Sequence, residues 1–148
     1  MWVVAGTTTL SGVNTFTGPT TNSAGPLNLA NGSALQNSTL NLVGGTLVFD
    51  SSVSSNAFVF GGLTGTANLT LANNASSAIN LAVGNNGGST TCSGALNDNG
   101  AGGSLTKIGN GTLTLSGANN YSGSTTVKGG TLGISTLLTN ATPGIAVD

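Results

Sequence analysis

The sequence predicts an all-β protein made of stacked coils, a parallel β-helix, and three observations support this fold class. Short runs in which apolar and polar residues alternate recur along the 148 residues, and each run directs two apolar side chains to one face, as a β-strand does. Glycine-rich corners separate these runs. A stretch near the N-terminus is repeated near the C-terminus, and such repeats build folds in which neighbouring units share one core.

The predicted strands are short, and from Leu40 onward they begin about ten residues apart, a spacing typical of sandwiches, barrels and solenoids. The alternating runs are Leu27–Leu29, Leu40–Leu42, Leu47–Phe49, Phe58–Phe60, Leu69–Leu71, Leu81–Val83, Leu113–Leu115 and Leu132–Ile134. The corners expected between strands are Gly44–Gly45, Gly61–Gly62, Asn86–Gly88, Gly102–Gly103 and Gly129–Gly130. No window has the apolar spacing of a helix, and the abundant Thr, Val, Gly and Asn disfavour helices.

The short runs favour a solenoid over a sandwich. A sandwich joins longer runs by hairpins and places charged side chains on its outer faces. Here the outward positions hold Thr, Ser and Asn, which can stack into ladders between coils in register. If each coil contains on the order of 20 to 30 residues, the chain makes about five to seven coils, and each coil adds roughly 4.8 Å to the length of the solenoid. We therefore expect one solenoid domain over residues 1–148.

Composition excludes several classes of partner. Charged residues are 3% of the chain, histidine is absent and the formal net charge is −1, so the chain lacks the basic surface that binds nucleic acid. Apolar residues make up 37% and the mean hydropathy is +0.24, which argues against disorder. No apolar run reaches the roughly 18 residues of a membrane-spanning helix, and the start MWVVAGTTT lacks the pattern of a signal peptide. We expect neither a nucleic-acid partner nor membrane insertion by this segment.

The internal repeat is carried by a specific pattern. Residues 6–18 read GTTTLSGVNTFTG and residues 111–123 read GTLTLSGANNYSG, with matching glycines and an aromatic residue at Phe16 and Tyr121. The second copy extends over Leu105 to Ile134 and contains LTKIGNGTLTLSGANNY followed by GGTL. This stretch resembles the autotransporter-associated beta-strand repeat, also called the passenger-associated transport repeat, of bacterial secreted proteins.

The resemblance implies a right-handed parallel β-helix, export from the cell and a place on the bacterial surface, but no reaction. Along the chain it divides the domain into repeat-like segments 6–29 and 105–134, looser spacer coils 30–104 and an incomplete last coil 135–148.

Candidate catalytic and metal sites are few. The charged residues are Asp50, Asp98, Lys107, Lys128 and Asp148, and they lie far apart in sequence, so a paired acid and base is not expected and neither is an enzyme. Asp98, in LNDNG, is the best candidate metal ligand because such a loop offers several oxygens to a hard cation. A turn in which Asp98 bonds its own backbone is the favoured interpretation. No cofactor is expected.

The lone cysteine, Cys92, has no cysteine partner for a disulfide and no histidine to activate it as a nucleophile, so we expect a buried thiol in a strand. The threonines of 7–9, 112–114 and 125–126 suggest an ice-binding face. Their pairs do not recur once per coil, so structural threonine ladders are the favoured interpretation.

The two ends carry the main functional hypothesis. A solenoid leaves unpaired backbone groups at each end unless a helix, polar coil or charge covers them. Neither end has such a cap: the candidate assembly residues are Met1, Trp2, Val3 and Val4 at the start and Ile145, Ala146 and Val147 at the end. We therefore expect a structural extracellular solenoid whose last coil docks on the first coil of the next copy, giving a surface filament.

Three alternatives remain open. The chain could be part of a long autotransporter passenger acting as an adhesin stalk, with neighbouring repeats of the same chain as its partners. It could be a polysaccharide-active β-helix enzyme, although the usual acidic and basic groove residues are scarce. It could bind ice through its threonines. No row of aromatic or charged residues marks one side of the chain as an adhesive surface.

Overall fold

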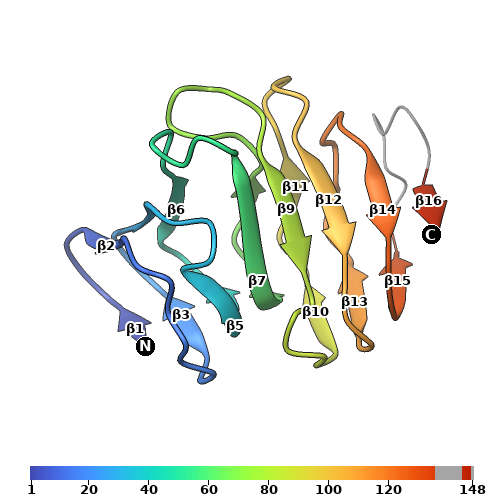
Figure 1. The fold of residues 1–148 in the computed structure, drawn as a ribbon, viewed down its shortest axis with the longest axis horizontal. Coiled ribbons are helices and arrows are strands. Elements are labelled where there is room, and N and C mark those ends of the chain that lie inside the picture. The colour runs from blue at the N-terminus through green and yellow to red at the C-terminus, as the bar shows by residue number, and fades with distance from the viewer. Residues whose placement is uncertain (136–144, 148) are drawn as a thin grey trace.

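The computed structural model describes residues 1–135 and 145–147, which form a β-solenoid of about 6 turns. Sixteen short strands follow one another along this part of the chain, and it contains no helix. The strands lie side by side along the long axis, with the N-terminus at one end and the C-terminus at the other (Figure 1). All strand pairs are parallel, so the predicted all-β solenoid is confirmed.

Each coil visits three faces in turn, which we call faces I, II and III. Face I contains the edge strand nearest the N-terminus and runs the length of the molecule. Its strands are β1 (Trp2–Val3), β3 (Thr20–Asn22), the end of β5 (Leu35–Leu42), the end of β7 (Ala57–Gly65), β10 (Thr90–Cys92), β13 (Thr112–Leu115) and β15 (Thr131–Ile134).

Face II contains a three-stranded sheet and a separate pair, which are connected by the bridge between Phe49 and Asn73. Its strands are β2 (Thr8–Leu10), β4 (Pro26–Leu29), β6 (Thr46–Phe49), β8 (Leu69–Thr70) and β11 (Leu96–Asn97). Face III consists of the start of β7, β9 (Asn80–Val83), β12 (Ser104–Lys107), β14 (Thr125–Val127) and β16 (Ile145–Val147).

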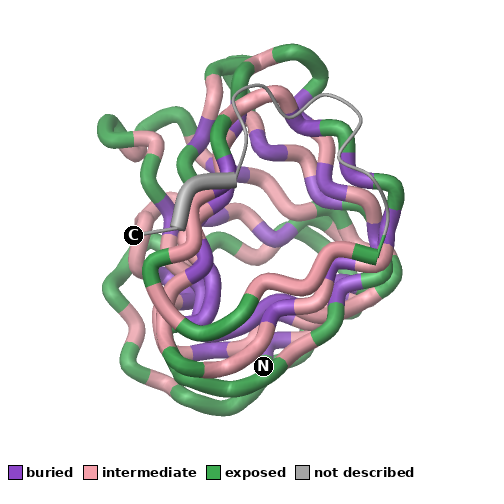
Figure 2. The backbone as a smooth tube through the Cα atoms, turned by 90° about the vertical axis from the view of Figure 1, so that its right-hand side faces the viewer, coloured by how far each residue is buried: buried purple, intermediate pink, exposed green. Residues whose placement is uncertain are grey.

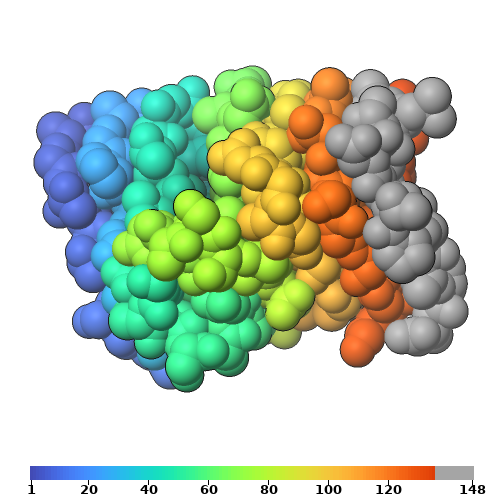
Figure 3. All heavy atoms as spheres, turned by 90° about the horizontal axis from the view of Figure 1, so that it is seen from above, coloured from blue at the N-terminus to red at the C-terminus, as the bar shows by residue number. Residues whose placement is uncertain are grey.

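Coil length is not constant along the solenoid. Trp2 pairs with Thr21 of the following coil, whereas Gly65 pairs with Cys92, so the coil that begins at Gly65 is much the longer of the two. The spacer coils are therefore longer than the repeat coils, and the extra residues lie in loops between strands. In the space-filling view the coils form successive layers in sequence order from one end to the other (Figure 3).

The core is a thin column of aliphatic side chains inside the three faces. Inward residues on successive coils lie above one another, as Leu40 and Leu63 do on face I, and both have 0% of their surface exposed. Seen along the axis, buried residues alternate with intermediate ones along the walls of the solenoid, and exposed residues gather at its corners (Figure 2). The ring of Phe49 lies 4.6 Å from that of Phe58 and 6.1 Å from that of Phe60, measured between centroids. Burial of each such side chain contributes about 1.5–3 kcal/mol.

The prediction of a turn at Gly61–Gly62 is wrong. Both glycines lie inside β7, at the point where this strand leaves β9 on face III and joins β5 on face I. A Cβ on Gly61 would lie 2.5 Å from the backbone carbon of Asn37, and one on Gly62 would lie 2.8 Å from Oγ1 of Thr39. Glycine is required here because β5 approaches closely, and the corner is a bend within a continuous strand.

The two repeat copies lie on different faces. In the first copy β2 and β4 pair on face II, whereas the equivalent strands of the second copy, β13 and β15, pair on face I. The alternating pattern requires only that one side of each strand faces inward, and any face satisfies this requirement. The lengths of the intervening spacer coils decide which face a strand joins.

Candidate functional site

The first coil presents open strand edges to solvent. β1 pairs only with β3 and β2 only with β4, so the other edge of each strand has no partner within the described residues. Trp2, Val4 and Val13 are 75%, 59% and 62% exposed, unusually high for large apolar side chains in this chain. The ammonium group of Met1 donates to the carbonyl oxygen of Pro19 at 2.7 Å.

Three of the four residues predicted as the N-terminal assembly surface are therefore accessible. Met1, Trp2 and Val4 are exposed, but Val3 is only 2% exposed, because it alternates with Trp2 and points into the core. At the opposite end, β15 pairs only with β13 and β16 only with β14 in the described part of the chain. Ile145, Ala146 and Val147 form β16; their side chains and the rest of the predicted last coil, 136–144 and 148, lie outside the described residues.

Three glycines distinguish the first coil from the second repeat copy. A Cβ on Gly111, Gly117 or Gly123 would lie 2.3 to 2.4 Å from a carbonyl oxygen of the preceding coil. Their equivalents in the first copy have open space: a Cβ would meet nothing within 4 Å at Gly6 and Gly18, and only Oδ1 of Asn14 at 3.7 Å at Gly12. The matching glycines are visible in the sequence, but their contact with a preceding coil is visible only in the structure.

Asp98 lies in a turn, in line with the favoured interpretation. Its two carboxylate oxygens accept five hydrogen bonds, from the backbone N–H groups of Gly100, Gly102, Gly103 and Ser122 and from the hydroxyl of Ser122. The residue is 2% exposed. Burial opposes ionisation, but the bonds from Ser122 and the glycines outweigh it and lower the pKa of Asp98 to about 2.

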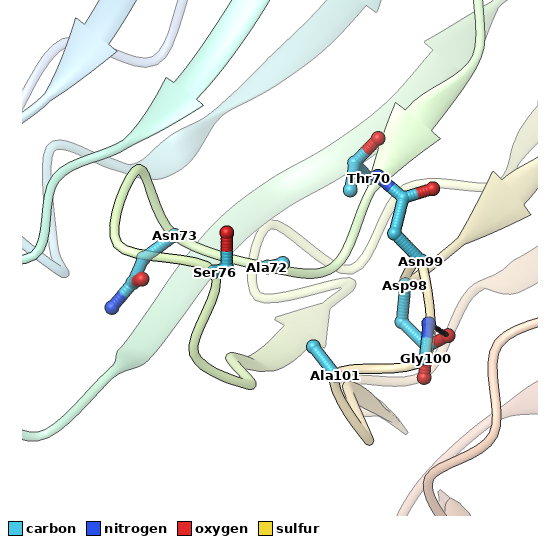
Figure 4. Close-up of a pocket in the computed structure, with 8 residues that line it drawn as sticks. All are labelled: Thr70, Ala72, Asn73, Ser76, Asp98, Asn99, Gly100 and Ala101. Carbon is cyan, nitrogen blue, oxygen red and sulfur yellow. Dashed lines mark hydrogen bonds between the residues drawn. The ribbon is translucent and has the colours of Figure 1, made fainter.

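This carboxylate is not arranged as a cation ligand. Its oxygens face N–H and O–H donors, and no cluster of three or more His, Cys, Asp or Glu occurs among the described residues. A hollow of about 240 Å³ adjoins it, lined mainly by small and polar residues such as Asn73, Ser76 and Asn99 (Figure 4). The dashed line in Figure 4 joins Asp98 to Gly100 of its own turn. Asp98 is the one titratable residue that lines the hollow.

Lys107 is fully buried and its charge meets backbone oxygens. Its Nζ donates to the carbonyl oxygens of Ile108, Gly109 and Gly129, at 2.9 Å and 3.2 Å for the two glycines. Burial lowers the pKa of Lys107. Because Gly129 belongs to the next coil, the ammonium connects two coils at a corner. In the sequence Lys107 stands out only as one of few charged residues, and nothing in its local pattern indicates burial.

Two further reactive side chains, those of Cys92 and Tyr121, are also buried. Cys92 lies in β10 with 2% of its surface exposed, as predicted, and burial raises the pKa of its thiol. Tyr121 is fully buried, and its hydroxyl lies 2.6 Å from Oγ1 of Thr125. Burial raises the pKa of Tyr121, while the bond to Thr125 partly offsets this effect.

Threonines form a row on face I that the sequence did not reveal. Thr21, Thr64, Thr91 and Thr114 occupy equivalent outward positions on successive coils, with Asn41 between the first two. Unequal coil lengths hide this row in the sequence. The hydroxyl of Thr64 donates to the carbonyl oxygen of Thr91 at 2.8 Å, as expected for a structural ladder. A second row beside it is interrupted where Thr39 pairs with Gly62.

The geometry thus defines a parallel β-solenoid, and no helix long and apolar enough to cross a bilayer occurs in the described ranges. Residues 5–29 and 105–134 match the model of the passenger-associated-transport-repeat family. These two matched regions confirm the resemblance seen in the sequence. Comparisons with curated proteins and with solved structures found no match.

Proposed function

We propose that this chain is a structural module of an extracellular protein on the bacterial surface, and that its solenoid shape is its function. The observation that carries this proposal is the passenger-associated-transport-repeat, which matches two regions of a continuous β-solenoid. This repeat is found in autotransporter passengers, which are surface-bound or secreted. Antibody labelling of intact cells tests the location: signal only after permeabilisation would refute it.

Within this role, the chain assembles end to end into a filament. The strands β1 and β2 at one end and β15 and β16 at the other each have an edge without a partner among the described residues. These edges support the proposal, because unpaired parallel edges can accept a further coil. Stacking the end of one copy on the start of the next is a heterologous contact that does not close, and such contacts produce fibres. The low charge leaves little repulsion between copies.

Negative-stain microscopy of the purified chain tests assembly. We expect unbranched filaments, and aligned filaments should give a diffraction repeat of about 4.8 Å along their axis from the spacing of parallel strands. Monodisperse particles at all concentrations would refute filament formation while leaving the structural role intact.

A second candidate is an adhesin stalk, in which the same open edges pair with neighbouring coils of one longer chain. The observation that favours it is the repeat itself, which matches two regions of this chain, since each unit of a repeat protein stacks on the neighbouring units of the same chain. The full reading frame separates the candidates: flanking repeats together with a poorly soluble isolated chain support the stalk.

We propose that the module is not an enzyme. The two most buried charged side chains, Asp98 and Lys107, are occupied by five and three hydrogen bonds respectively. They accept from or donate to backbone and a serine hydroxyl, so neither is free to transfer a proton to a substrate. A polysaccharide hydrolysis assay with an Asp98→Ala control tests this proposal; activity that the substitution abolishes would refute it.

A further inference from the structure

We propose that the exposed end of the solenoid at the first coil is the docking surface for the last coil of a second copy, and that the two copies stack in a single register. In this register β1 of one copy continues face I beyond β15 of the other, with Trp2 beside Gly133 and Val3 beside Ile134. The inference rests on the proposed filament and specifies its contact.

The glycines of the first coil are the first argument. Gly12 and Gly18 have ample room for a side chain in the isolated molecule, yet their equivalents Gly117 and Gly123 are in contact with carbonyl oxygens of a preceding coil. A Cβ at those equivalent positions would approach to 2.4 Å and 2.3 Å. The second repeat copy therefore shows how this surface looks when a coil covers it. The first copy of the repeat has the same glycines, but no preceding coil lies against them within the described residues.

The in-register row on face I is the second argument. Trp2 pairs with Thr21, and the row continues through equivalent outward positions to Thr114, which pairs with Gly133. The inward row beside it runs in the same way from Val3 to Ile134. One further step at the same spacing places Trp2 of the next copy over Gly133. Glycine leaves space there for the indole ring, and an aromatic residue commonly covers a strand glycine in this way.

The exposed side chains are the third argument. Trp2, Val4 and Val13 are 75%, 59% and 62% exposed, all within the first coil. Coverage by another coil would remove part of this apolar surface from water, which favours association. No charged side chain precedes Asp50 in the sequence, and the one charge of the first coil is the ammonium group of Met1, which is hydrogen-bonded to the carbonyl oxygen of Pro19. Little charge is therefore desolvated by the contact.

Side-chain additions at the open glycines test the contact. Gly12→Val and Gly18→Val should fold as stably as the parent chain, because neither glycine has a positive φ and both have free space. They should raise the critical concentration for filaments at least about tenfold, because a Cβ blocks the approach of the next coil. Gly117→Val is the matched control at the equivalent position of the second repeat copy. It should lower the melting temperature, because a Cβ there would lie 2.4 Å from the carbonyl oxygen of Gly94. Thr91→Val, exposed on the side of face I, should change neither property.

Cross-linking tests the register and the identity of the partner. In a Cys92→Ser background, Trp2→Cys combined with Gly133→Cys should give a ladder of covalent oligomers on oxidation. In-register parallel neighbours lie about 4.8 Å apart, within the Cα distance that a disulfide spans. The control pair, Val13→Cys with Gly133→Cys, should give no ladder.

The outcomes separate the two proposals. If the parent chain forms no filaments, both the filament and its register are overturned. The parent chain could form filaments while Gly12→Val and Gly18→Val also form them and the Trp2→Cys, Gly133→Cys variant gives no covalent ladder. In that case only the register is wrong. Filaments lost in both glycine variants, with a ladder from Trp2→Cys and Gly133→Cys, support both.

Discussion

Replacing Asp98 by asparagine should remove most of the acid sensitivity of this solenoid. The folded pKa of Asp98 is about 2, against 3.8 for an unperturbed carboxyl group. Because the folded pKa is the lower one, the ionised carboxylate stabilises the fold above pH 4, and this contribution disappears as pH falls through 2. The difference between these two pKa values corresponds to about 2.4 kcal/mol at pH 7, at about 1.36 kcal/mol for each pH unit.

The structure gives the physical reason for this magnitude. Four of the five hydrogen bonds end on Oδ2, and two of these come from Ser122 of the next coil. An asparagine side chain can place its carbonyl oxygen where Oδ2 lies, but it carries no charge. Its NH₂ group then takes the place of Oδ1 and faces the N–H of Gly100, so that two donors meet. We therefore expect Asp98→Asn to lower the free energy of unfolding by about 2 kcal/mol at pH 7.

Urea unfolding of the monomeric chain, followed by circular dichroism between pH 7 and pH 2, measures this effect. The parent and Asp98→Asn curves should converge as pH falls, because only about 0.4 kcal/mol of the carboxylate contribution remains at pH 2. Asp50→Asn is the control: hydrogen bonds from Asn28 and Ser52 lower the pKa of Asp50, but this group lies at the surface. Parallel curves for the parent and Asp98→Asn across this pH range would refute the reasoning.

One further substitution and one labelling reaction test the buried groups. Lys107→Met should lower the free energy of unfolding by about 2 kcal/mol, because it leaves three carbonyl oxygens without their ammonium donor; an unchanged or higher urea midpoint would contradict this. The thiol of Cys92, buried and with a raised pKa, should react with an aromatic disulfide reagent only after unfolding, and rapid labelling of the native chain at pH 8 would show that β10 is open to solvent.

The strands with clear alternation were predictable from the sequence. Leu27–Leu29, Leu47–Phe49 and Leu113–Leu115 all lie in strands, since period-two burial depends on neighbouring residues alone. Strands rich in threonine, such as Thr20–Asn22 and Thr125–Val127, lack this contrast and were recognised only in the structure. Their buried positions Thr20, Asn22 and Thr125 hold polar side chains that form hydrogen bonds within the molecule.

The candidate site was predictable in its location but not in its detail. The apolar residues at the start of the chain were predicted from the sequence to lie on an accessible surface, and Trp2 and Val4 are exposed. It could not indicate that Val3 turns inward, because the phase of a short strand depends on which residue of the next coil it pairs with. Asp98 and Lys107 were visible as rare charges, whereas their partners Ser122 and Gly129 come from the next coil.

Local chemistry alone therefore specifies an all-β solenoid built on a repeated unit: alternation makes each strand, and glycine makes the corners and the close approaches. Only tertiary structure decides which face each strand joins and which residues stack, because coils of unequal length give no constant period from which stacking can be counted. The same tertiary contacts distinguish the covered glycine Gly117 from the open glycine Gly12. Two identical local patterns differ only in whether another coil lies against them.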